Sequence, residues 1–157
     1  MGSVGSRAQI NQESGCRLKR ILVPIDFSAA SSRALEFARS LAEQYGARLL
    51  LLHVIDINAQ YPRSAALPAS EMTTELWARG LTAMRQLARS LENQVAVRTV
   101  VEDGLPWEQI VSWSEESDLV ILANNGKWSP WKIFSRHTVE RVLQKAACPL
   151  MIVHHHN

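Results

Sequence analysis

The segment that most restricts the possible folds of this chain is Arg48 to Ile55, which reads Arg-Leu-Leu-Leu-Leu-His-Val-Ile. Its side chains are apolar at nearly every consecutive position, so a strand formed by it would be hydrophobic on both faces. Strands of that kind occur in parallel sheets covered by helices on both sides, whereas half-exposed strands alternate apolar and polar side chains. The segment therefore predicts a central strand of a covered parallel sheet.

Strand-like apolar runs and helix-like amphipathic runs alternate along the rest of the chain. We predict strands at 20–26, 48–55, 95–101, 119–123 and 149–153, and helices between them at about 30–45, 70–93, 106–116 and 137–146. Parallel neighbours need a crossover connection, and such crossovers are right-handed. The alternation therefore predicts an α/β fold: a single doubly wound, Rossmann-like domain with helices on both faces of the sheet.

The helices at 30–45 and 70–93 each carry an apolar stripe with helical spacing. Ser28 is the expected N-cap of the first helix, Gly46 its expected end, and Ser70 the expected cap of the second. Gly80 inside the second helix costs about 1 kcal/mol relative to alanine, so we expect a close packing contact there. The stripes consist of Ala30, Ala34, Phe37, Ala38, Leu41 and Tyr45, and of Leu76, Trp77, Leu81, Met84, Leu87, Ala88 and Leu91.

Three segments follow predicted strands and could share one crevice, because ligands of doubly wound sheets bind beyond the carboxyl ends of the strands. They contain Asp26, Val54 with Asp56, and the segment 123–138. A loop from a strand end to a helix start, as at 123–138, is where α/β proteins hold phosphates.

The segment 123–138 supports more than one interpretation. Its basic side chains could bind an anion by charge, or they could be solvated loop residues. Its aromatic side chains could fold back as local core, or they could form a docking surface for a protein partner. The basic residues are Lys127, Lys132, Arg136 and His137, and the aromatic residues of the expected partner surface are Trp128, Trp131 and Phe134.

Several function classes have little support in the sequence. A net charge of +2 over 157 residues gives no reason to expect nucleic-acid binding, and no apolar run approaches the length of a membrane span. No metal-ligand spacing is present, and no motif joins a nucleophile, a base and an orienting group. Asp26, His53 and His137 are the acid–base candidates, but His53 in a strand is expected to be a core histidine. We therefore expect no catalytic residues, no metal and no enzymatic activity.

The ends of the chain differ in character from its centre. Residues 1–18 lack periodicity, which predicts a disordered N-terminal tail before a domain at 19–153, with a short C-terminal tail at 154–157. Cys16 and Cys148 do not form a disulfide framework, which favours a reducing, cytoplasmic location.

From about Lys19 to Val153 the chain resembles the universal stress proteins. Five segments carry the resemblance in order and at compatible spacings: 21–28 (Ile-Leu-Val-Pro-Ile-Asp-Phe-Ser), 51–56, 104–106 (Gly-Leu-Pro), 118–122 and 138–153. The resemblance implies a five-stranded parallel sheet of order 3-2-1-4-5 and a stress-response function through unknown protein partners. It also implies a homodimer in which the last strand, with Leu150, Met151, Ile152 and Val153, pairs across a two-fold axis.

The same resemblance bears on nucleotide binding. In members that bind nucleotides, the positions of Asp26 and Val54 approach the adenosine, and the phosphates lie in a loop of pattern Gly-x-x-Gly, nine residues, then Gly-Ser or Gly-Thr. Here those positions are Ala123, Gly126, Arg136 and His137, and Thr138 follows.

A side chain at a glycine position blocks the backbone from phosphate oxygens, so we expect the usual cradle to be absent and no cofactor to be bound. The alternative is a stress switch that binds a nucleotide, either AMP or ATP with Mg²⁺. Its binding residues would be Pro24, Asp26, Val54, Gly126, Arg136, His137 and Thr138.

Overall fold

The order of helices and strands agrees with the alternation predicted from the sequence. The computed structural model describes residues 17–56, 69–124 and 136–154. The expected tails therefore lie outside the described residues over 1–16 and 155–157. Most element ends differ by one or two residues from the prediction. The elements are β1 (Arg20–Pro24), α1 (Ala29–Tyr45), β2 (Arg48–Ile55), α3 (Ala69–Leu91), β3 (Val97–Asp103), α4 (Pro106–Ser114), β4 (Leu119–Asn124), α5 (Arg136–Lys145) and β5 (Leu150–His154).

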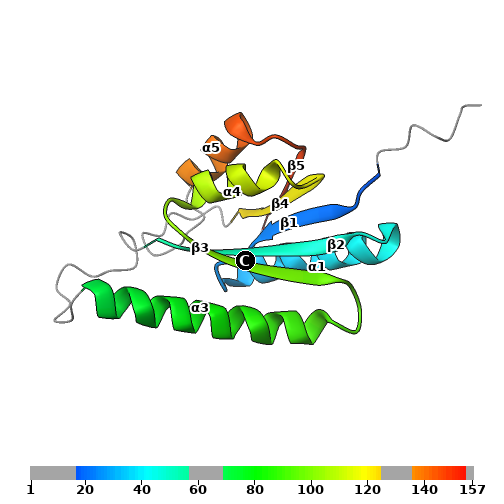
Figure 1. Ribbon diagram of the computed structural model, residues 1–157. Helices are drawn as coiled ribbons and strands as arrows, with labels where there is room; N and C mark the ends of the chain where they lie inside the picture. The colour runs from blue at the N-terminus through cyan, green and yellow to red at the C-terminus, as the bar shows by residue number, and fades with distance from the viewer. Residues whose placement is uncertain (1–16, 57–68, 125–135, 155–157) are drawn as a thin grey trace, which may run out of the picture.

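The five strands form one parallel sheet of order β3-β2-β1-β4-β5, which confirms the expected doubly wound topology. β2 pairs with β1 through Arg20↔Arg48 and with β3 through Leu49↔Val97. Figure 1 shows α4 and α5 on one side of the sheet, away from α3 on the other.

Two hydrophobic layers fill the space between the sheet and its helices. Leu49 and Leu51 of β2 pack under α1 and α3, whereas Leu50, Leu52 and Val54 pack under α4 and α5. Both faces of β2 are therefore buried, as its continuous apolar sequence predicts. Each fully buried leucine contributes about 1.5–3 kcal/mol through removal of its side chain from water.

The predicted apolar stripes are only partly correct. Met84 and Leu91 of α3 are buried, but Leu81 is 38% exposed, and Phe37 and Tyr45 of α1 are 46% and 58% exposed. The reason in α1 is the small size of its contact residues. Alanines at 30, 34, 38 and 42 are almost fully buried and bring the helix axis close to the sheet, so larger side chains fit only on its flanks.

The predicted caps and ends of the helices are also only partly correct. Ser28 caps α1 by accepting a hydrogen bond from the backbone N–H of Ser31 at 3.1 Å. Gly46 ends the helix in the left-handed conformation, with φ at 65°. Ser70 is not a cap, because α3 already includes Ala69 and places Ser70 inside its first turn.

Candidate functional site

A tight turn after β1 fixes the carboxylate of Asp26. Its Oδ1 accepts a hydrogen bond from the backbone N–H of Ser28 at 3.0 Å. Phe27, between them, has a φ of 59°, and no other non-glycine residue in the described part of the chain has positive φ. The turn leads directly into the Ser28 cap of α1, so the Asp26 side chain is held by the start of that helix.

The second oxygen of the Asp26 carboxylate is buried. Oδ2 has no hydrogen-bond partner among the residues that the structure describes. Buried polar atoms in proteins are nearly always satisfied, and a charged acceptor gains most from a donor. Asp26 therefore offers an acceptor to a ligand or to water at the carboxyl end of β1.

A pocket of about 670 Å³ opens beside this carboxylate, a volume in the usual range of small-molecule sites. It lies between the β1–α1 turn, the end of β2 and one face of α3. Its described lining residues are Asp26, Phe27, His53, Leu76, Ala78, Arg79, Gly80, Thr82, Ala83 and Gln86.

His53 lies in the wall of this pocket and is 7% exposed, which fits the expected core histidine. Its Nδ1 lies 2.8 Å from the carbonyl oxygen of Ile25, so Nδ1 carries the proton and donates it. Burial lowers the pKa of His53 below its ordinary value of 6.5, although the bond to Ile25 and the charge of Asp26 act in the opposite direction. The imidazole is therefore neutral at pH 7.

The close packing contact expected at Gly80 is present, and it forms the α3 side of the same pocket. A Cβ at this position would lie 3.0 Å from Cδ2 of His53. The sequence did not indicate which side chain it contacts, nor that Phe27 and one face of α3 take part in the site.

The other predicted nucleotide residues do not line the described part of this pocket. Pro24 is buried at the end of β1, and the side chain of Val54 is 2% exposed beneath α4 and α5. Thr138 is buried in α5. His137 is exposed and accepts a hydrogen bond from Nε of Arg141 at 2.9 Å. Among the predicted nucleotide residues whose side chains the structure describes, only Asp26 lines the pocket, where it lies with His53 and α3.

Several predicted residues cannot be placed in this way. Gly126 and the aromatic residues Trp128, Trp131 and Phe134 lie outside the described residues, as do Lys127 and Lys132. Arg136 is the first residue of α5.

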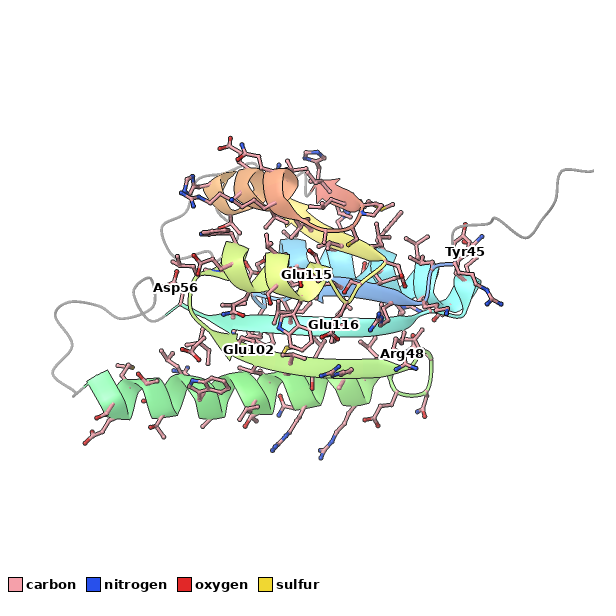
Figure 2. The ribbon with its side chains drawn as sticks, turned by 45° about the horizontal axis from the view of Figure 1, so that its top comes forward. Tyr45, Arg48, Asp56, Glu102, Glu115 and Glu116 are labelled. Carbon is pink, nitrogen blue, oxygen red and sulfur yellow. The ribbon has the colours of Figure 1, made fainter. Side chains whose placement is uncertain are left out.

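Two acidic residues, Asp56 and Glu102, lie at the carboxyl ends of β2 and β3, opposite the end of the sheet that carries Arg48 (Figure 2).

The α4–α5 side carries a feature that the sequence did not single out. The guanidinium of Arg141 lies 4.7 Å from the ring centre of Trp107, and Nζ of Lys145 lies 6.0 Å from it. These contacts hold two basic side chains of α5 against α4.

β5 lies at one edge of the sheet and pairs with β4. Its residues Leu150, Met151, Ile152 and Val153 are all half-buried. An apolar edge strand is suited to pairing with another chain, although the homodimer itself stays a prediction.

No helix in 17–56, 69–124 or 136–154 is long and apolar enough to cross a membrane. The same residues contain no group of three metal-ligating side chains.

Burial raises the pKa of the half-buried Cys148 thiol.

Comparisons with known proteins agree with the resemblance seen in the sequence. A family model described as "Universal stress protein family" matches residues 17–154. Universal stress protein MJ0531 of Methanocaldococcus jannaschii is 28% identical over 142 residues, which cover 86% of this chain and 81% of that protein.

Two solved structures show the same fold. Universal stress protein UspA from Lactobacillus plantarum has a TM-score of 0.70 at 24% identity, covering 87% of this chain and 98% of that one. A universal stress protein family protein from Arabidopsis thaliana, solved with AMP bound, has a TM-score of 0.65 at 16% identity, covering 88% and 92%.

Proposed function

Because the chain belongs to the universal stress protein family, we propose that it is a non-catalytic stress-response protein whose Asp26 pocket binds the base of a small adenine nucleotide such as AMP. The observation that carries this proposal is the buried Oδ2 of Asp26, which lacks a donor among the described residues. The exocyclic amino group of adenine is a donor of the required kind. The AMP-bound structural neighbour supports the same ligand class for this fold.

The phosphate end of the ligand has weaker support in this chain. Ala123 and Arg136 stand at two of the three glycine positions, and His137 stands at the hydroxyl position. Ala123 is 2% exposed in β4, so its side chain belongs to the core. Without these two glycines the backbone approach to phosphate oxygens is restricted. ATP with Mg²⁺ should therefore bind little more tightly than AMP.

The same substitutions favour a second candidate, a dimeric stress protein that acts through protein partners without any nucleotide. In that case Trp128, Trp131 and Phe134 would supply the partner surface, since clustered aromatic residues beside basic ones are typical of interface hot spots. The β5 edge supports the dimeric part of this proposal, because it has one neighbour strand in the described sheet.

Calorimetric titration of the purified protein with adenosine, AMP and ATP·Mg²⁺ separates the two candidates. Asp26→Asn is the informative variant, because its amide oxygen can still accept the N–H of Ser28 while its NH₂ replaces the Oδ2 acceptor. We expect micromolar to millimolar binding of AMP by the natural protein and a loss of about 10- to 100-fold in Asp26→Asn.

Glu116→Gln, which removes an exposed charge on the far side of the fold, is the matched control and should leave AMP binding unchanged. Absence of binding by all three ligands would contradict the nucleotide proposal and support the second candidate. Binding of ATP·Mg²⁺ at least 100-fold more tightly than AMP would show instead that the 123–138 segment holds phosphates.

A further inference from the structure

Phe27 has an unusual backbone for a bulky residue. Its φ of 59° lies in the left-handed region, which large side chains rarely adopt. The hydrogen bond from the N–H of Ser28 to Asp26 closes the turn around it, and Ser28 then caps α1. Backbone strain of this kind persists only where the surrounding structure holds it, and it is concentrated at functional sites.

This backbone directs the Phe27 ring to the pocket instead of the core. The side chain is 46% exposed, although neighbouring apolar residues such as Ile25 are buried. Its ring centre lies 4.8 Å from that of His53, with the two planes tilted by 53°. One part of the ring thus rests on His53, and the ring lines the pocket next to Asp26.

The side of the pocket formed by α3 includes three small residues, Ala78, Gly80 and Ala83, among larger ones. Because Gly80 lacks a Cβ, the helix can approach the His53 ring, which lies in the pocket wall under Phe27. A pocket lined by an exposed aromatic face suits a flat ring, because stacking on that face requires a planar partner.

We propose that Phe27 is the residue that determines ligand specificity in this pocket, by stacking on a planar heteroaromatic ring whose amino group donates to Oδ2 of Asp26. The inference rests on the proposed function, and it adds a requirement for the ligand's shape and donor. Bases that present an amino group to Oδ2 of Asp26 should bind. Bases with an oxo group at that same position should bind poorly, because their carbonyl oxygen would face the carboxylate. Sugar phosphates without a base should not bind.

The test compares Phe27→Leu with Phe27→Tyr in the full-length protein. Leucine keeps an apolar side chain but has no flat face, whereas tyrosine keeps the face, and both remain at the same strained backbone position. The probes are AMP, inosine monophosphate and ribose 5-phosphate, titrated by calorimetry, with thermal unfolding recorded for each variant.

We expect Phe27→Leu to weaken AMP binding by about 10-fold and Phe27→Tyr by less than about 3-fold, with similar unfolding temperatures. The natural protein should prefer AMP to inosine monophosphate by at least about 10-fold. If Phe27→Leu binds AMP as tightly as the natural protein while Asp26→Asn does not, the stacking role is wrong and the proposed function stands. If the natural protein binds neither nucleotide, both are wrong.

Discussion

Gly80 of α3 lies directly against the imidazole of His53 in β2, so closely that a Cβ at position 80 would lie 3.0 Å from Cδ2 of that ring. The ring cannot easily move away, because its Nδ1 donates to the carbonyl of Ile25 at 2.8 Å. A helix-destabilising residue is thus retained where α3 approaches the buried histidine. This contact joins the carboxyl end of the sheet to the helix that closes the pocket.

Gly80→Ala should lower the free energy of unfolding by about 1 kcal/mol. Alanine gains about 1 kcal/mol of helix propensity, but overpacking against the fixed His53 ring costs about 1–3 kcal/mol. In a His53→Ala background the ring is absent, so the same substitution should instead stabilise the protein by about 1 kcal/mol. Urea unfolding of the four proteins measures both effects. Equal effects in the two backgrounds would show that the contact with His53 is unimportant.

The alternation of apolar runs was sufficient to predict the fold, and Gly80 shows where such prediction ends. A glycine inside an amphipathic helix indicates a close contact but not its partner, which depends on how α3 is rotated over the sheet. The same limit applies to Phe37 and Tyr45, which the apolar stripe predicts to be buried and which are exposed. Helical spacing defines a stripe, whereas the distance between helix and sheet, set in α1 by alanines, decides how much of it is buried.

The candidate site was predictable only in part for a related reason. Asp26 follows a strand, so its place at the carboxyl edge could be expected. Phe27 could not be assigned to the pocket, because a left-handed backbone is associated with glycine and a phenylalanine in sequence normally indicates core. His53 was correctly expected to be buried, but its neighbours come from elements far apart in the sequence.

Stability should fall as the pH decreases from 7.5 to 5.5. Burial lowers the pKa of His53 in the folded protein, so the unfolded chain takes up a proton near 6.5 while the folded protein does not. The stability is therefore complete above 6.5 and is lost as the pH falls from there toward the lowered pKa. The midpoint of urea unfolding should therefore be lower at pH 5.5 than at pH 7.5.

His53→Gln provides the control for this pH dependence, because its amide can donate to Ile25 but does not titrate in this range. Its stability should change less between pH 7.5 and 5.5 than that of the natural protein. An unchanged slope in His53→Gln would assign the effect to other groups.

Asp118→Ala should destabilise the protein by about 1–3 kcal/mol. Oδ2 of Asp118 accepts hydrogen bonds from the backbone N–H groups of Lys19 and Arg20, at 2.9 and 2.8 Å, and so fixes the start of β1 beside β4. Glu116→Ala is a matched control, because it also removes a negative charge near Arg20. Its exposed ion pair of 3.9 Å should contribute less than about 0.5 kcal/mol. Similar losses in both variants would mean that charge alone is responsible.

The proposed homodimer makes β5 the edge at which a second copy pairs. Ile152 is half-buried, and within the described residues it packs against neither hydrophobic cluster, unlike Leu150, Met151 and Val153. Ile152→Lys should therefore leave the monomer folded while it places a charge in the interface between two copies. Light scattering coupled to size-exclusion chromatography should give the dimer mass for the natural protein and the monomer mass for this variant.

The opposite edge of the same sheet offers the control for this experiment. Thr99→Lys introduces the same charge on β3, the other edge strand, and should leave the dimer mass unchanged. A natural protein that is monomeric at micromolar concentration would contradict the dimer proposal outright. A dimer that survives Ile152→Lys but not Thr99→Lys would move the interface to β3, and the apolar sequence of β5 would then need another explanation.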